Sequence, residues 1–104
     1  MQTYLVVRRS AWSSLEQQCE ADARSAFEAA RMEEEIASIQ SYPLEESDRR
    51  IGSICVYEAS SPEAVRRHAA AAFLPIDEIV KVVDPGTARA AEAWSTSTRR
   101  ERSQ

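Results

Sequence analysis

The sequence predicts an α+β sandwich whose elements follow the order strand, helix, strand, strand, helix, strand. Three observations support this fold class: four short segments rich in β-branched and aromatic residues, two longer segments with apolar residues at helical spacing, and a helix-start signal before each of those two. At 104 residues the chain has the size of one domain. We expect that domain over residues 1–86, followed by a short helix and a tail over residues 87–104.

The N-terminal part of the chain predicts a strand followed by a helix. Residues 3–9, TYLVVRR, are rich in strand formers. Ser13 and Glu16 have the spacing of a capping box, in which side chains satisfy the free amides at a helix start. In the helix that follows, apolar residues recur at intervals of three and four, so we expect them to form its buried face. They are Leu15, Cys19, Ala23, Ala26, Phe27 and Ala30.

The middle of the chain predicts a hairpin of two strands. Residues 36–44, IASIQSYPL, form the first of them, and Pro43 predicts an edge position because proline cannot donate a hydrogen bond to a neighbouring strand. The polar run EESDRR makes the turn, and residues 51–59, IGSICVYEA, form the second strand.

The C-terminal half predicts a second helix and a fourth strand. Ser61 can cap the helix, and Pro62 at the first helical position loses no needed hydrogen bond. Pro75 ends this helix, and residues 77–84, DEIVKVVD, form the strand. The segment PGTARAAEAW predicts a short further helix, and we expect the tail STSTRRERSQ to be disordered because it has no apolar surface to bury.

This order of elements is the ferredoxin-like, split βαβ pattern, in which the first and third strands lie at the centre of an antiparallel sheet. Those two strands carry the unbroken apolar runs YLVV and ICVY. Both helices lie on one face of this fold, so the apolar runs predict that something covers the other face. A partner subunit or a bound ligand can do so, and a homodimer paired through its sheets is the simpler expectation.

Charge and composition exclude several classes of protein. With 17 acidic and 13 basic residues the net charge is −4, and scattered arginine pairs such as Arg8 and Arg9 predict solvated surface rather than a nucleic-acid site. The apolar N-terminal run is too short for a secretory signal or a membrane span, so we expect a cytoplasmic protein. Cys19 and Cys55 belong to no CxxC motif and are expected to be buried as small apolar residues.

His68 is the one histidine of the chain. On the predicted helix it shares a stripe with Val65, Ala69, Ala72 and Phe73, which places the imidazole at the edge of the buried face. One interpretation is a packed ring whose nitrogens are satisfied by a backbone carbonyl or water. The other is a metal ligand or proton carrier at a cleft. A transition metal such as nickel then needs further ligands from carboxylate, tyrosine, backbone or a second subunit.

Three tyrosines, Tyr4, Tyr42 and Tyr57, lie in predicted strands and line a ligand pocket if they converge. Ordinary packing with the hydroxyls at the rim is the alternative. We single out Tyr42 and Tyr57 as ligand-binding candidates. Glu58 points to the opposite face from Tyr57 because side chains alternate along a strand.

Several short motifs, which together span nearly half the chain, carry a family resemblance. They are SY at 41–42, CVYEA at 55–59, SPEAVRRHA at 61–69, LPIDEIVKV at 74–82 and DP at 84–85, and YLVVRR at 4–9 agrees more loosely. Through them residues 41–88 resemble a bacterial domain-of-unknown-function family whose described member is a small nickel-binding, ferredoxin-like protein.

The resemblance implies a compact, usually paired α+β subunit with a site that involves the histidine matching His68. Gln40 stands where the family often has a histidine, and an amide is a weak nickel ligand compared with imidazole. Phe73 stands where glycine is expected ahead of LP. The Trp94 segment and the tail extend past the family's usual end and are candidate contacts for a protein partner.

Three functional hypotheses follow. The first is a small dimeric binding protein for a divalent transition metal such as nickel, or for a small ligand, with His68 as the metal contact and no catalytic residue. The second is an isomerase, cyclase or cofactor-independent oxygenase in which His68 exchanges a proton with a small substrate. The third is an accessory subunit that binds a larger enzyme through its sheet or through Trp94. Trp12 and Trp94 are otherwise expected to anchor their segments to the core. We expect a binding protein rather than an enzyme, and neither a nucleic-acid nor a membrane partner.

Overall fold

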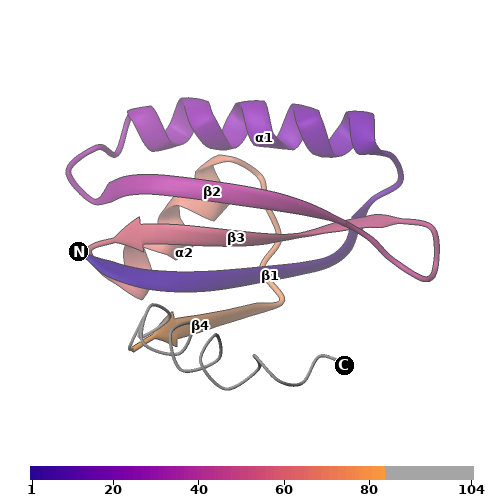
Figure 1. Ribbon diagram of the computed structural model, residues 1–104. Coiled ribbons are helices and arrows are strands. Elements are labelled where there is room, and N and C mark those ends of the chain that lie inside the picture. The colour runs from indigo at the N-terminus through magenta and orange to yellow at the C-terminus, as the bar shows by residue number, and fades with distance from the viewer. Residues whose placement is uncertain (84–104) are drawn as a thin grey trace, which may run out of the picture.

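The structure, a computed structural model, describes residues 1–83. The expected terminal helix, the tail and Trp94 lie outside these residues. Six elements follow one another in the predicted order (Figure 1). They are β1 (Gln2–Trp12), α1 (Leu15–Ala30), β2 (Ile36–Glu45), β3 (Ile51–Ala59), α2 (Pro62–Ala71) and β4 (Glu78–Val82). The predicted ferredoxin-like α+β fold is therefore confirmed.

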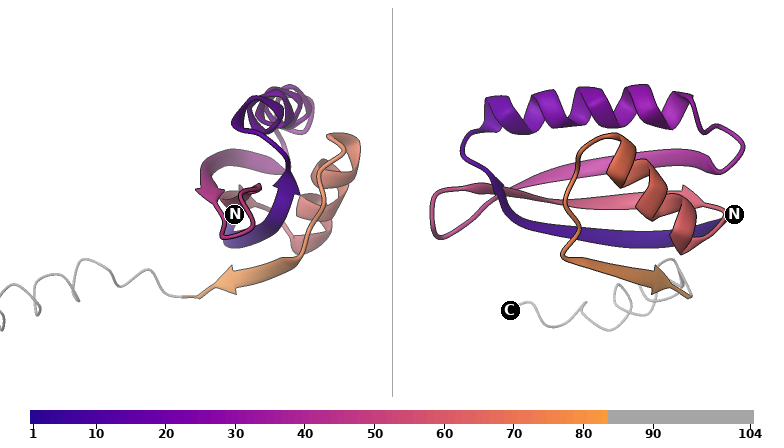
Figure 2. Two further views of the ribbon diagram at one scale, coloured as in Figure 1. Left: turned by 90° about the vertical axis from the view of Figure 1, so that its right-hand side faces the viewer. Right: turned by 180° about the vertical axis from the view of Figure 1, so that it is seen from behind.

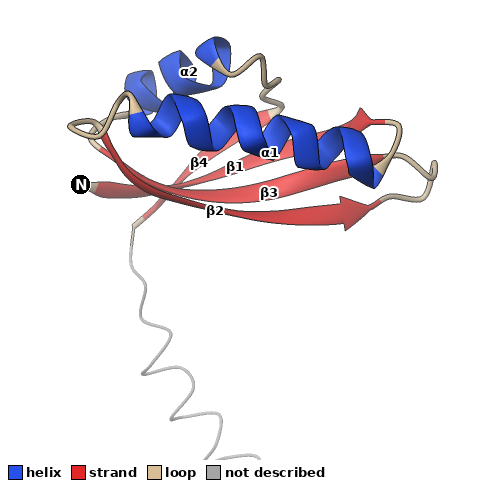
Figure 3. Cartoon of the chain, turned by 90° about the horizontal axis from the view of Figure 1, so that it is seen from above, coloured by secondary structure: helices blue, strands red, loops and turns tan. Residues whose placement is uncertain are grey.

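The four strands form one antiparallel sheet in the order β2-β3-β1-β4. As predicted, β1 and β3 are central, β2 lies at an edge and pairs with β3 as a hairpin. Figures 2 and 3 show α1 and α2 on the same face of the sheet, with α1 running along the side where β2 lies. The other face carries no element of the described chain.

The first strand extends further than the sequence predicted, to Trp12 instead of residue 9. A bulge lies between Arg8 and Trp12, where Ser10 has a φ of 48°, and beyond it Trp12 pairs with Ile51. Opposite the bulge, a Cβ on Gly52 would collide with the Arg8 carbonyl oxygen and a Glu46 carboxylate oxygen. Glycine is therefore required at this close approach of two strands, and the bulge buries Trp12 as the expected anchor.

Both helices begin with a serine cap, but the first begins one residue later than predicted. Ser14, not Ser13, is the N-cap of α1, and its side chain accepts from the backbone N–H of Gln17. The Gln17 side chain in turn accepts from the backbone N–H and the hydroxyl of Ser13. The reciprocal pair thus uses the glutamine at the third helical position instead of Glu16. Ser61 caps α2 with Pro62 in its first turn, as predicted.

The face of α1 that packs on the sheet is not the one that its apolar residues predicted. Its buried residues are Gln18 and Ala21, whereas Leu15 is 54% and Phe27 is 61% exposed. Cys19 is exposed as well, so only Cys55 is buried as expected. A second stripe of short and polar residues at the same helical spacing faces inward, and its Ser25 carbonyl lies 2.9 Å from His68 Nε2.

The second helix ends at a strained residue. The backbone N–H of Phe73 bonds to the Ala70 carbonyl, and that of Leu74 bonds to the Ala69 carbonyl, which together form a Schellman motif. Phe73 occupies its left-handed position with a φ of 57°, where glycine is usual and another residue costs about 1–2 kcal/mol. Its side chain is 79% exposed, so Phe73 does not belong to the buried stripe in which the sequence placed it.

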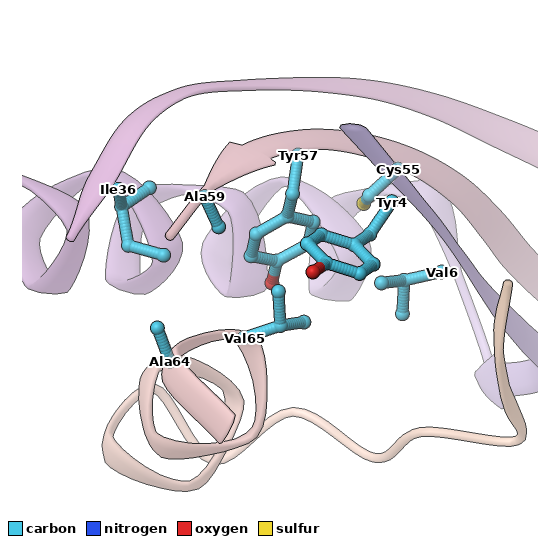
Figure 4. Close-up of a cluster of buried hydrophobic side chains, with 8 residues drawn as sticks. All are labelled: Tyr4, Val6, Ile36, Cys55, Tyr57, Ala59, Ala64 and Val65. Carbon is cyan, nitrogen blue, oxygen red and sulfur yellow. The ribbon is translucent and has the colours of Figure 1, made fainter. Parts of the chain in front are cut away.

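The apolar core lies between the sheet and α2 (Figure 4). The two central strands contribute alternate residues that point toward the helices, and α2 contributes its small face. The cluster consists of Tyr4, Val6, Ile36, Cys55, Tyr57, Ala59, Ala64 and Val65. Most of these side chains are small, so the core supplies a modest apolar area and leaves room for polar groups beside it.

Candidate functional site

Three buried polar side chains from three elements meet beside the apolar core. Arg8 of β1 is 1% exposed, Tyr57 of β3 is completely buried, and His68 of α2 is 0% exposed. The Tyr57 hydroxyl lies 2.8 Å from His68 Nδ1, and Arg8 Nη2 donates to the Tyr57 oxygen at 3.2 Å. The rings of Tyr57 and His68 meet edge to face at an interplanar angle of 77°. We call Arg8, Tyr57 and His68 the buried triad.

The hydrogen bonds of His68 determine which of its nitrogens carries the proton. Nε2 lies 2.9 Å from the backbone carbonyl oxygen of Ser25 in α1. A carbonyl can only accept, so Nε2 carries a hydrogen and donates it. Nδ1 of the neutral ring then accepts from the Tyr57 hydroxyl, whose oxygen accepts from Arg8. Hydrogen bonds thus run in one direction from β1 through β3 and α2 to α1.

Arg8 brings a positive charge into the interior without a carboxylate partner among residues 1–83. Its Nε donates to the Pro75 carbonyl at 2.7 Å and its Nη1 to Cys55 Sγ at 3.1 Å, in addition to the bond to Tyr57. The two ion pairs of the described chain lie elsewhere, between Arg9 and Glu46 and between Arg67 and Glu35. A buried charge is costly, so these three neutral acceptors carry its solvation.

Burial and the charge of Arg8 both shift the pKa values of His68 and Tyr57. Burial lowers the pKa of His68, and the positive charge of Arg8 lowers it further, while the Ser25 carbonyl opposes this. Burial raises the pKa of Tyr57, an effect that Arg8 partly offsets. Near neutral pH the triad therefore contains a neutral imidazole and a neutral phenol.

A cleft of about 370 Å³ opens between α1 and β2, next to the triad. Asp22 and Ser25 line it from α1, and Ile39 and Ser41 line it from β2. Ser25, which lines the cleft, also accepts a hydrogen bond from His68 through its backbone carbonyl. The Ser41 hydroxyl lies 3.4 Å from Cys55 Sγ. The polar residues of the cleft are therefore Asp22, Gln40 and two serines, and the cleft reaches the triad through Ser25 and Cys55.

The structure brings together two of the three residues that the sequence selected. Tyr57 and His68 share a hydrogen bond, whereas Tyr42 pairs with Ile54 and lies on the uncovered face of the sheet, 49% exposed. The tyrosines thus do not line one pocket. Glu58 lies on the face opposite Tyr57, as strand alternation predicted, and accepts from the Thr3 hydroxyl at 2.7 Å.

The residue that the sequence interpretation missed is Arg8, which was taken for solvated surface together with Arg9. Arg9 is exposed, as expected. The signal for Arg8 was its position: it follows Tyr4 and Val6 at a spacing of two, and therefore lies on their buried face of β1. His68 was expected to be half-buried at the edge and is completely buried.

The comparison with known families fits this architecture. Residues 4–82 match the family described as nickel responsive protein SCO4226-like. The chain belongs to this family. No curated protein and no solved structure matches it. None of the helices described in residues 1–83 is long and apolar enough to cross a membrane.

The SCO4226-like family implies nickel, but the donors of one copy do not fit a nickel ion. Among residues 1–83 no three His, Cys, Asp or Glu side chains converge. Both nitrogens of His68 have hydrogen-bond partners, and the charge of Arg8 that lowers the pKa of His68 also disfavours a metal cation there. Gln40 pairs with Val56 on the edge strand and lines the cleft between α1 and β2, and His68 does not line that cleft. The metal role of His68 stays a prediction, and it requires that Ser25 or Tyr57 first release the ring.

The Tyr57→Phe substitution should destabilise this SCO4226-like chain by about 1–3 kcal/mol, the cost of leaving buried polar groups without a partner. Arg8 Nη2 and His68 Nδ1 both lose the hydroxyl between them. Urea denaturation of the two proteins measures the difference. Tyr4→Phe is the matched control, since Tyr4 is buried in the same cluster but its hydroxyl makes no hydrogen bond within the described chain. Equal losses in both variants would show that the hydroxyl of Tyr57 has no special role.

Mild acid should destabilise the protein through His68. The folded state holds the pKa of His68 below its ordinary value. Below about pH 6.5 the unfolded chain therefore binds a proton that the folded chain does not, and the free energy of unfolding falls by up to about 1.4 kcal/mol per pH unit from this group until the folded pKa is reached. Above about pH 6.5 the ring is neutral in both the folded and the unfolded chain, so its effect on stability no longer changes with pH.

Urea denaturation at about pH 7.5 and about pH 5.5 measures this loss, on either side of the ordinary histidine pKa. His68→Gln is the comparison, because its amide can donate to Ser25 while lacking a titrating group. The wild-type protein should lose more stability than the variant between the two pH values. An identical loss in both proteins contradicts the assignment.

Proposed function

We propose that this chain is a homodimeric binding protein, paired through the uncovered face of its sheet, that takes a small organic ligand in the cleft between α1 and β2. Membership of a family described as nickel responsive supports a sensing or binding role over catalysis. The observation that carries the proposal is the apolar character of the uncovered face.

That face is apolar at its centre, while Gln40 pairs with Val56 on β2 and Glu78 pairs with Val7 on β4. The sheet register and strand alternation place Leu5, Val7, Ile54 and Val56 at its centre, with Val80, Val82 and Tyr42 on the outer strands. The four central residues are half-buried by one another, and the other three are exposed. Figure 3 shows that both helices lie on the opposite side. A continuous apolar surface of this kind is typical of an interface, and a second copy offers the same surface by symmetry.

The polar groups at the border of this face support a specific pairing. Glu58 is held by Thr3 at one end of the central strands, and Arg9 lies at the other end, beside Glu46. The charged side chains thus stand around the apolar centre, as in the polar rim of a protein–protein interface. Two copies related by a two-fold axis can bury the centre and leave these charges in water.

The cleft supports a small ligand with a cationic or hydrogen-bond-donating group. Its volume of about 370 Å³ lies at the lower end of the range of about 300–1,000 Å³ for small-molecule sites. Asp22 supplies a negative charge, and Ser25 and Ser41 supply hydroxyls, against the apolar wall of Ile39 and Ala29. The net charge of −4 attracts cations in general.

Catalysis by His68 has less support than binding. A proton-exchanging residue must come within hydrogen-bond reach of its substrate, whereas His68 is completely buried and does not line the cleft. The accessory-subunit hypothesis relies partly on Trp94, which lies outside the described residues, and the cytoplasmic location stays a prediction.

The Val56→Lys substitution should convert the dimer into a monomer. It places an ammonium group at the centre of the apolar face, where pairing would bury it without a partner. Light scattering coupled to size-exclusion chromatography at micromolar concentration measures the mass. Ala70→Lys, an equal change on the exposed side of α2, should leave the dimer intact. A monomeric wild-type protein would overturn the proposed pairing.

Ligand binding in the cleft can be tested with a panel of small organic amines and alcohols. Each compound is added to the full-length protein, and thermal denaturation gives the melting temperature. Amines that bind should raise the melting temperature of the wild-type protein and of Glu20→Gln, but not that of Asp22→Asn. The reason is that Asp22 lines the cleft, whereas Glu20 is an exposed acid on the same helix. If no compound raises the melting temperature, or if Asp22→Asn responds equally, the cleft is not the site.

Nickel chloride forms a separate arm of this experiment, measured by isothermal titration calorimetry. While both nitrogens of His68 are hydrogen-bonded the ring cannot bind nickel, so the wild-type protein and His68→Gln take up nickel equally unless Ser25 or Tyr57 releases the ring. Micromolar uptake that is lost in His68→Gln would establish His68 as a nickel ligand and would show that the triad opens.

A further inference from the structure

We propose that a groove between α1 and the end of α2, formed around Phe27 and Phe73, is the docking site for the C-terminal segment of the same chain, with Trp94 as the anchor. The groove lies on the helix layer. It is therefore separate from the uncovered face of the sheet and from the cleft beside Asp22, and it can be filled in either oligomeric state.

The groove has an apolar floor and two exposed aromatic walls. Its volume is about 290 Å³, and its lining residues are Ala23, Arg24, Phe27, Glu28, Ala71 and Phe73. Phe27 and Phe73 are among the most exposed large apolar side chains of the described chain. Arg31 stacks on the ring of Phe27 at 5.7 Å, and Arg24 bonds to the Ala72 carbonyl at 2.9 Å, so both helices are held in place at the groove. A space of this size suits one or two side chains better than a drug-sized ligand.

The backbone of Phe73 supports a function for its exposed ring. Phe73 has a φ of 57° at the position where a Schellman motif favours glycine. A bulky residue there is strained, and within the described chain its ring gains little packing in return. Strain of this kind persists where a site uses the side chain. The family resemblance predicts glycine at this position, and this chain has an exposed aromatic ring there instead.

The C-terminal segment of the chain is long enough to reach this groove. Trp94 lies eleven positions beyond Val83, the last described residue, and is the one aromatic residue of residues 84–104. An extended chain of that length spans about 36 Å. Phe73, which lines the groove, is ten positions before Val83, so its distance from Val83 cannot exceed the span of ten residues, and the eleven positions to Trp94 can cover it.

Charge also favours the C-terminal segment as the occupant of the groove. Arg99, Arg100 and Arg102 follow Trp94, with one acidic residue among them. On the other side, Glu16 and Glu20 are exposed on α1, and Glu33 and Glu34 are exposed just after its end. With Trp94 in the groove, the arginines come within reach of these carboxylates on either side of it. The interaction is between exposed charges and should therefore weaken with salt.

The test uses the full-length protein labelled with 5-fluorotryptophan and observed by fluorine NMR. Two signals are expected, from Trp12 and Trp94, and Trp94→Phe identifies them. The Trp94 signal should differ from its position in urea in the wild-type protein. In Phe73→Gly and in Phe27→Ser it should move to the urea position, while the Trp12 signal stays. Both substituted side chains are exposed, so the fold should tolerate their loss.

Leu15→Ser is the matched control, since Leu15 is an exposed apolar residue of α1 outside the groove and its loss should not move the Trp94 signal. High salt should shift part of the signal toward the urea position, and dilution should not. A Trp94 signal already at the urea position, or one that ignores Phe73→Gly, overturns the docking. A docked signal that is lost on dilution assigns the groove to the segment of a second copy and overturns the contact within one chain.

Discussion

The buried guanidinium of Arg8 is the constraint on which the rest of the structure depends. Its three hydrogen bonds reach the loop before β4 through Pro75, and β3 through Cys55 and Tyr57. Tyr57 then holds His68 of α2, and His68 holds the Ser25 carbonyl of α1. This charge has no carboxylate partner in the described chain. Loss of any of these acceptors therefore destabilises the folded state, because it leaves the buried charge less solvated. The triad therefore joins the sheet to both helices through directional hydrogen bonds, which the small apolar core does not supply.

The hydrogen bonds that start at Arg8 end on the polar stripe of α1, at the Ser25 carbonyl. Asp22 and Ser25 of the same stripe line the adjacent cleft. Gln18 is buried on that stripe, with its amide nitrogen unpaired within the described residues. The apolar residues of α1 are left on the outside, and the uncovered sheet face adds more of them. Several large apolar groups thus lie at the surface, and both proposed interfaces follow from this distribution.

The order of elements, the sheet topology and the second helix cap were predictable from local patterns. Pro43 indicated the edge strand, the runs YLVV and ICVY indicated the central ones, and Ser61 with Pro62 indicated the start of α2. The buried face of α1 was not predictable, because helical spacing identifies two candidate stripes and the choice between them depends on what lies beneath. Arg8 was missed for the same reason: alternation along β1 placed it inward, but only the tertiary structure supplies acceptors that allow a charge there.

The topology also separates the two positions that the family resemblance associates with nickel. Position 40 lies on the edge strand β2, where Gln40 pairs with Val56 and also lines the cleft between α1 and β2, while His68 is completely buried and does not line that cleft. Ser25 lies between that cleft and His68, and both nitrogens of His68 are hydrogen-bonded, so a histidine at position 40 would not by itself complete a site with His68. The two faces differ in the charge they tolerate, since Arg8 makes the helix side of β1 positive and the uncovered side has no buried cation in the described chain. A metal cation is therefore disfavoured at the buried histidine, close to the charge of Arg8.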